Sequence, residues 1–189
     1  MVDFVGSSIF EFQQAIFRID PTVKAPSSSC EHWTAPDVGC LKLNIDVAIS
    51  EDYGWIGIGA VVRDLTGRIL AVCCKKLKGL FDSYTIKLLA MRESLYFAID
   101  SGFIAAVLEN DSLKAVLVVH TKSNDLFATS LIVADIISLL SINGGGFYNF
   151  VRHSGNKVAH SLAKFSSSMF WYEEIPNCII NLVANDLHF

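Results

Sequence analysis

The stretch LKLNIDVAIS, residues 41–50, decides the fold and poses the main question about this chain. Its odd positions are apolar, and its even positions are polar or small. This alternation is typical of a β-strand with one face toward a core. Asp46 lies in the middle of the polar face, although aspartate is disfavoured inside strands. A carboxylate near a core needs a cation, a hydrogen-bond partner or water, so Asp46 is a candidate functional residue.

The composition predicts one globular domain with a sizeable core. The chain has 189 residues, of which 52% are hydrophobic and only 18% are charged, so wholesale disorder is not expected. The formal net charge of −4 argues against a generic basic nucleic-acid-binding protein. It leaves open a site that binds nucleic acid locally or through metal ions.

Cysteine usage and the N-terminus predict an intracellular protein, with nucleus and cytoplasm both left open. The five cysteines are odd in number and form no CxxC motif, which favours free thiols over a disulfide framework or a cysteine zinc site. The first residues lack the basic region of a secretory signal. No apolar run reaches the roughly 20 residues of a membrane span, so no membrane contact is expected.

The chain divides into a short N-terminal segment and one domain. Residues 8–18 predict a helix, because Ser8 and Glu11 have the spacing of a capping box. A stretch rich in proline and serine follows and is typical of a linker. We therefore assign 1–32 to an N-terminal helix and linker, and 33–189 to the domain.

Three strands in close succession open the domain, at 41–50, 55–64 and 68–77. Short turns between consecutive strands predict antiparallel pairing. Gly57 and Gly59 in the second strand indicate that another backbone or a ligand approaches closely.

The rest of the chain alternates helices and strands. The expected elements are a helix at 84–101, a strand at 105–111, helices at 112–120 and 131–141, a strand at 145–153 and a helix at 156–168. A meander followed by such alternation predicts an α/β fold with a mixed sheet covered on both faces.

This order, with an aspartate in the first strand, resembles the ribonuclease H fold. The motifs that carry the resemblance are HWTAPDVGCLKLNIDVA, GIGAVVRDLTGRIL, LAMRESLYFAIDSGF, LENDSLKAV, FVRHSGNKVAHSLAKF and WYEEIP. In this order and spacing they are similar to the plant-type, reverse-transcriptase-associated family of ribonuclease H type-1 domains, which is retroelement-derived. The resemblance extends from Trp33 to Asp186. It implies a five-stranded mixed sheet, with three antiparallel strands and then two parallel to the first.

The resemblance also implies an activity, which is endonucleolytic hydrolysis of the RNA strand of RNA–DNA hybrids, and RNA–DNA hybrids or other nucleic acid as partners. We separately expect the chain to be a monomer. The family uses two divalent ions, Mg²⁺ or Mn²⁺, which activate a water and stabilise the leaving oxygen. Two such ions need several anionic oxygen ligands. The family pattern places metal ligands at Asp46 and Asp111, and a further catalytic position at His160.

The residues alone leave other roles open for these side chains. Asp46 also fits a strand-edge residue that faces solvent, and Asp111 fits the N-cap of the next helix. His160 fits a polar helix surface. We interpret Glu109 as an ordinary polar residue, although it shares a strand face with Asp111. His153 is near the family's mobile catalytic histidine, but the spacing is short, so we interpret it as a turn residue.

The sequence departs from the pattern of active ribonucleases H at three positions. Lys87 occupies the acidic position of the first long helix, and Val47 replaces a glycine beside Asp46. His160 stands where many active enzymes have aspartate, although histidine is frequent at this position in the plant-type family. Lys87 shares a helix stripe with small residues, so its ammonium is expected near the site unless its stem turns outward. Histidine is a poorer ligand for Mg²⁺ than a carboxylate.

These departures predict that catalysis is impaired. Asp46, Asp111 and His160 are expected to line one cleft, with the two carboxylates roughly 4–8 Å apart, near enough to share an ion. A cation at Lys87 opposes the binding of divalent ions there. The alternatives are a non-catalytic module that binds nucleic acid or a protein, and a retroelement relic without a retained task.

Overall fold

The computed structural model describes residues 32–50, 54–79, 81–122, 127–165 and 167–187. The helix predicted at 8–18 and the linker after it lie outside the described residues. The boundary between the N-terminal segment and the domain therefore stays a prediction.

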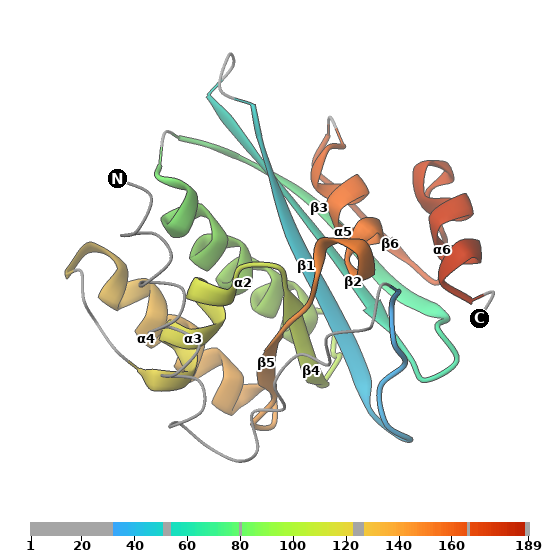
Figure 1. Cartoon of the computed structure of the whole chain (residues 1–189), viewed down its shortest axis with the longest axis horizontal. Coiled ribbons are helices and arrows are strands. Elements are labelled where there is room, and N and C mark those ends of the chain that lie inside the picture. Colours follow the sequence, from blue (N-terminus) through green and yellow to red (C-terminus); the bar gives the residue numbers. More distant parts are fainter. Residues whose placement is uncertain (1–31, 51–53, 80, 123–126, 166, 188–189) are drawn as a thin grey trace, which may run out of the picture.

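A six-stranded mixed sheet forms the centre of the described chain, in the spatial order β5-β4-β1-β2-β3-β6 (Figure 1). The strands are β1 (Leu41–Ser50), β2 (Trp55–Arg63), β3 (Ile69–Lys78), β4 (Ala105–Asn110), β5 (Phe147–Phe150) and β6 (Met169–Tyr172). The pairs β1–β2 and β2–β3 are antiparallel, whereas β1–β4 and β4–β5 are parallel. This confirms the predicted fold class, with the first strand inside the sheet.

The strand count of five was wrong by one. The additional strand β6 pairs antiparallel with β3 at the edge of the sheet. Its four residues are too few for an alternating pattern to be recognised. The last predicted helix is also shorter than expected, because α5 (Lys157–Ala163) ends before 168 and leaves room for β6.

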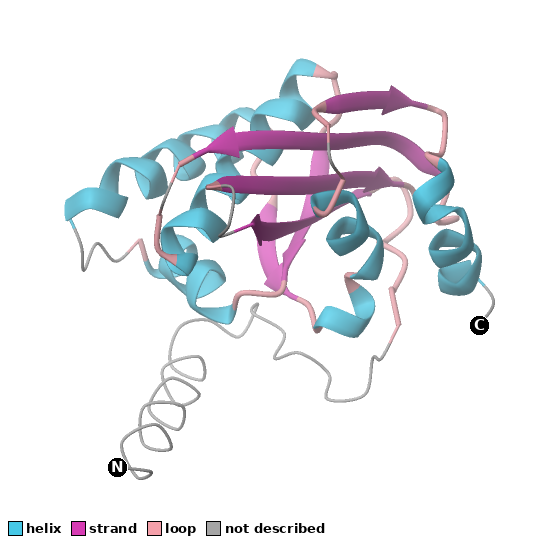
Figure 2. Ribbon diagram, turned by 90° about the horizontal axis from the view of Figure 1, so that it is seen from above, coloured by secondary structure: helices cyan, strands magenta, loops and turns pink. Residues whose placement is uncertain are grey.

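Helices cover both faces of the sheet (Figure 2). The other helices are α2 (Ser83–Asp100), α3 (Leu113–Thr121), α4 (Phe127–Ile142) and α6 (Ile180–Leu187), with 3₁₀ turns η2 (His153–Gly155) and η3 (Asn177–Ile179). Helices α2, α3 and α4 pack in one hydrophobic core, and α5 and α6 pack in a second core on the opposite face. Helix α4 begins earlier than the predicted 131, and α6 was not predicted. None of the described helices is both long and apolar enough to cross a membrane.

The apolar and polar side chains of β1 point to opposite faces of the sheet, as the alternation in its sequence predicts. Leu43, Ile45 and Val47 enter the core beneath α2. The polar face of β1 is buried as well, because Lys42, Asn44 and Asp46 are each at most 3% exposed. Buried polar groups need partners, and those partners build the candidate site.

Helix α5 packs unusually close to the second strand, β2. A Cβ on Gly57 would lie 1.9 Å from the Ala163 carbonyl oxygen, and a Cβ on Gly59 would lie 2.2 Å from that of Ala159. The close backbone approach predicted from the two glycines is therefore confirmed. Gly59 lies opposite Asp46 in the β1–β2 register, so α5 is held directly beside the aspartate.

The described cysteines are free thiols, as expected. Cys73 and Cys74 point to opposite faces of β3, and each belongs to a different core. Burial raises the pKa of both thiols to about 12, so neither is a reactive thiolate at neutral pH.

Candidate active site

The site is built around Asp46, which is 1% exposed. The alternative of a solvent-facing Asp46 is therefore wrong. The neighbouring Ile45 carbonyl accepts hydrogen bonds from Asn156 Nδ2 at 2.9 Å and Asn110 Nδ2 at 3.3 Å. These two bonds fix the end of β4 and the start of α5 next to Asp46.

Lys87 reaches the site from the first turns of α2. The helix begins at the N-cap Asp82, whose carboxylate accepts two backbone N–H groups. The residues that share the Lys87 stripe are buried, namely Ala90, Met91, Ser94 and Ala98. The Lys87 ammonium donates to Asp46 Oδ1 at 2.6 Å and to Asp111 Oδ1 at 2.5 Å. The inward orientation is thus confirmed, and the outward alternative is wrong.

Asp111 follows the last residue of β4 and faces Asp46 across the Lys87 ammonium. Asp46 Oδ1 and Asp111 Oδ1 both lie within 2.6 Å of Lys87 Nζ, so the distance between these two oxygens is below the expected upper limit of roughly 8 Å. The alternative role of Asp111 as N-cap is wrong, because Ser112 caps α3 and accepts from the Ala115 N–H.

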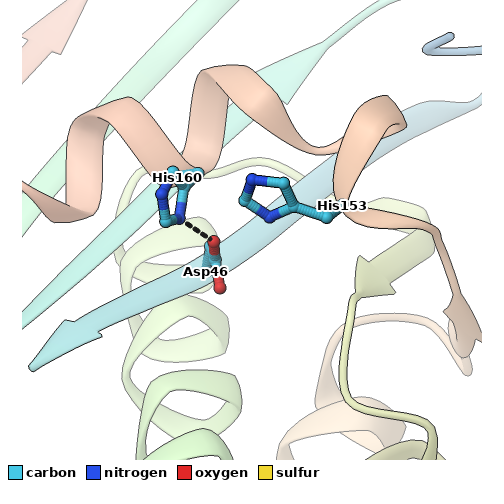
Figure 3. A group of neighbouring side chains, drawn as sticks. All are labelled: Asp46, His153 and His160. Carbon is cyan, nitrogen blue, oxygen red and sulfur yellow. Dashed lines mark hydrogen bonds and ion pairs between the residues drawn. The ribbon is translucent and has the colours of Figure 1, made fainter.

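Two histidines complete the cluster, His153 from η2 and His160 from α5 (Figure 3). His160 Nδ1 donates to Asp46 Oδ2 at 2.7 Å, so His160 is not a simple surface residue. The His153 ring lies 4.4 Å from the His160 ring, almost perpendicular to it. His153 Nδ1 also lies 3.6 Å from Asp111 Oδ2. The structure therefore brings His153 into the cluster, although its spacing in the sequence led us to interpret it as a turn residue.

Glu109 belongs to a separate buried polar network. It accepts from Lys42 Nζ at 2.6 Å and from Asn44 Nδ2 at 2.8 Å. The Asn44 side chain in turn accepts from the indole N–H of Trp33 at 2.9 Å. Glu109 is fully engaged there and has the ordinary polar role that we predicted. This network holds Trp33 against β1. Because Glu109 takes part in it, Asp46 and Asp111 are the acidic residues of the site.

The site carries its own counter-cation. Burial alone would lower the pKa of Lys87, but attraction to Asp46 and hydrogen bonds to Asp111 and Asp46 outweigh burial, so the pKa lies above its ordinary value of 10.5. Lys87 is therefore charged at neutral pH, and its charge offsets one of the two carboxylates.

These residues do not fit a pair of Mg²⁺ ions. Asp46 Oδ1 accepts from both Lys87 and the Val47 N–H, and Asp46 Oδ2 accepts from His160. Asp111 Oδ1 is bonded to the same ammonium. Mg²⁺ requires free anionic oxygens in nearly octahedral geometry, and a fixed ammonium repels it.

We expect Lys87→Met to destabilise the fold by about 3 kcal/mol, because it leaves Asp46 buried without its cation. The folded-state pKa of Lys87 is raised, so its stabilisation is complete below pH 10.5 and is lost as the pH rises through the raised pKa. Urea unfolding of both proteins, from neutral pH into the alkaline range, should show a difference that shrinks only above pH 10.5. Lys78→Met, at an exposed position, is the control. A difference that stays constant through the alkaline range would contradict this account.

The profile of the reverse transcriptase-like family matches residues 44–166, which include all the clustered side chains. The chain belongs to the reverse transcriptase-like family. Comparison with curated protein sequences found no match.

Solved ribonuclease H structures share the fold at low sequence identity. Ribonuclease H1 of Halobacterium salinarum is 19% identical, covers 66% of this chain and 94% of its own, and has a TM-score of 0.55. The N-terminal ribonuclease H domain of a Mycobacterium tuberculosis protein is 19% identical over 77% and 96% of the two chains, also with a TM-score of 0.55. LC11 ribonuclease H1, solved with an RNA/DNA hybrid, is 16% identical over 65% and 92%, with a TM-score of 0.57. This member of the reverse transcriptase-like family thus has a ribonuclease H-like domain of retroelement type.

Proposed function

We propose that this domain binds RNA–DNA hybrids or related nucleic acid, and that its capacity to hydrolyse them is strongly impaired. Family membership and the ribonuclease H fold support the substrate class. The proposed impairment rests on one observation, which is that the Lys87 ammonium bridges Asp46 and Asp111. Asp46, Asp111 and His160 are the residues that we assign to the former catalytic cluster, with Asp46 and Asp111 as its metal ligands.

Cations near the cluster support contact with a phosphate backbone. Arg152 and Lys157 are exposed on either side of η2, in the segment that carries His153 and His160. Phosphate contacts from arginine and lysine position a nucleic acid without reading its sequence. A local pair of this kind is compatible with the net charge of −4, which disfavours only broad nonspecific binding.

A second candidate function is a non-catalytic module that binds nucleic acid or a protein partner. The Lys87 bridge favours it too, because the ammonium offsets one of the two carboxylate charges without any metal ion. The two candidates differ in whether residual cleavage can be measured. A relic without a task predicts neither cleavage nor binding.

The deciding experiment measures binding and cleavage of a labelled RNA–DNA hybrid by the purified chain, in Mg²⁺ and in Mn²⁺. We expect salt-sensitive binding, and cleavage at least about a hundredfold below that of an active ribonuclease H1. A mispaired charge in a poorly solvated site costs about 3 kcal/mol, and each 1.4 kcal/mol corresponds to about tenfold. Arg152→Ala with Lys157→Ala should weaken binding and reduce its salt dependence.

Three outcomes would change the proposal. Robust Mg²⁺-dependent cleavage that disappears in Asp46→Asn would overturn the impairment and keep the ribonuclease function. Binding without any cleavage would favour the non-catalytic module. Failure of the chain to bind any hybrid or single strand would reject a nucleic-acid function altogether.

A further inference from the structure

The side chains around Asp46 fit Mg²⁺ poorly, but they include ligand atoms of the types that a different metal ion prefers. Asp46, His153 and His160 each offer one ligand atom, and these atoms all lie within 4.8 Å of one another (Figure 3). We propose that these three side chains form a binding site for Zn²⁺ or a similar transition-metal ion. The proposal does not rest on hybrid binding or hydrolysis.

The chemistry of the donors favours zinc over magnesium. Two imidazoles and one carboxylate form a typical three-residue zinc site, in which a water or another ligand takes the fourth position. Imidazole nitrogen suits borderline ions such as Zn²⁺, whereas Mg²⁺ prefers oxygen ligands and retains its waters.

The geometry needs only a small adjustment. With zinc bonds of about 2.0–2.2 Å, tetrahedral ligand atoms lie roughly 3.3–3.5 Å apart. His160 Nδ1 and Asp46 Oδ2 are already 2.7 Å apart, and the ion would take the place of the proton between them. His153 must approach, and its side chain is 56% exposed and therefore free of tight packing.

The surroundings hold the carboxylate ligand in place and limit the effect of the nearby cation. Asp46 Oδ1 is fixed by the Val47 N–H and by Lys87, which leaves Oδ2 as the oxygen that faces the histidines. Hydrogen bonds to the unused oxygen of a ligand orient it and tune its basicity. Lys87 also pairs with Asp111, so its charge is shared with a carboxylate outside the proposed zinc ligands.

The test is zinc titration of the tag-free, 189-residue chain by competition with a chromophoric chelator. Nucleic acid is left out, so failure here is distinguishable from failure of the proposed function. We expect one Zn²⁺ per chain, unaffected by millimolar Mg²⁺. Co²⁺ in place of Zn²⁺ should give the visible absorption of a four-coordinate site.

The variants separate this site from other zinc ligands of the chain. His153→Ala should weaken zinc binding at least about tenfold. The side chain is exposed, so the variant should fold as wild type does, which circular dichroism can check. His160→Asn should weaken binding as strongly. His120→Gln and Cys178→Ser change a histidine and an exposed thiol that are not among the three ligands, so binding should be unchanged in both.

Three results would overturn the site. The first is that the wild-type chain binds no zinc. The second is that zinc binding survives both His153→Ala and His160→Asn, and the third is that millimolar Mg²⁺ displaces the zinc. Loss of zinc in the two histidine variants, with retention in the two controls, is the pattern that the structure supports.

Discussion

Lys87→Glu combined with His160→Asp is expected to give measurable Mg²⁺-dependent cleavage of an RNA–DNA hybrid, whereas the wild type is expected to cleave it little or not at all. The first change replaces +1 by −1 between Asp46 and Asp111, where the ammonium now contacts both carboxylates. At an effective dielectric near 20, one unit charge about 4 Å from another contributes roughly 4 kcal/mol. Screening by solvent reduces this value, and we expect metal binding to tighten by at least about tenfold.

The second change supplies a carboxylate where His160 now contacts Asp46. Both changes act on the same proposed metal ligands, so their effects should be more than additive. Without metal, the double variant should be less stable than wild type, because three acids then surround Asp46 without a cation. Binding of Mg²⁺ to the folded state alone should restore stability in proportion to affinity.

Hybrid cleavage and thermal unfolding with and without Mg²⁺ measure these two effects. Adding Asp46→Asn to the double variant should abolish the recovered activity and the Mg²⁺-dependent stabilisation. Lys78→Glu makes the same change of charge at an exposed position at the end of β3, and should gain neither property. A folded double variant that binds no metal would place the defect elsewhere, with Val47 the next position to change.

The sequence predicted most of the fold because the decisive signals are local. The alternation in 41–50 and the short turns after it require an antiparallel meander. The inward orientation of Lys87 was also predictable, because 3.6-residue periodicity places it above Ala90 and Met91, which the structure buries. Gly57 and Gly59 likewise predicted the close approach of another backbone or a ligand to β2, and the structure shows that it is the backbone of α5.

What escaped prediction depends on contacts between distant segments. The strand β6 exists because four residues pair with β3 at the sheet edge, and a pairing of that length leaves no periodic pattern. His153 enters the cluster because η2 places its ring 4.4 Å from the His160 ring and its Nδ1 3.6 Å from Asp111 Oδ2. The spacing in the sequence alone did not indicate this geometry. Such a role could have been suspected only from the second histidine seven residues later.

Gly59→Ala is expected to destabilise the fold by about 3 kcal/mol or more and to disrupt the proposed zinc site. The new Cβ would lie 2.2 Å from the Ala159 carbonyl oxygen and 2.4 Å from the Ala163 nitrogen. Both are backbone atoms of α5, so no side chain can rotate away to relieve the clash. The helix must move off the sheet, which costs packing in the second core beyond the usual 1–3 kcal/mol of an overpacked site.

Gly102→Ala is the matched control for this substitution. Gly102 has φ of +76°, but a Cβ there would meet nothing within 4 Å. It should therefore cost only about 1 kcal/mol of backbone strain and leave zinc binding intact. In Gly59→Ala, by contrast, displacement of α5 carries His160 away from Asp46, so zinc affinity should fall together with the free energy of unfolding. Urea unfolding and zinc titration of the two variants measure both quantities. If Gly59→Ala proves as mild as Gly102→Ala, the close packing of α5 on β2 is not what holds the histidine against the aspartate.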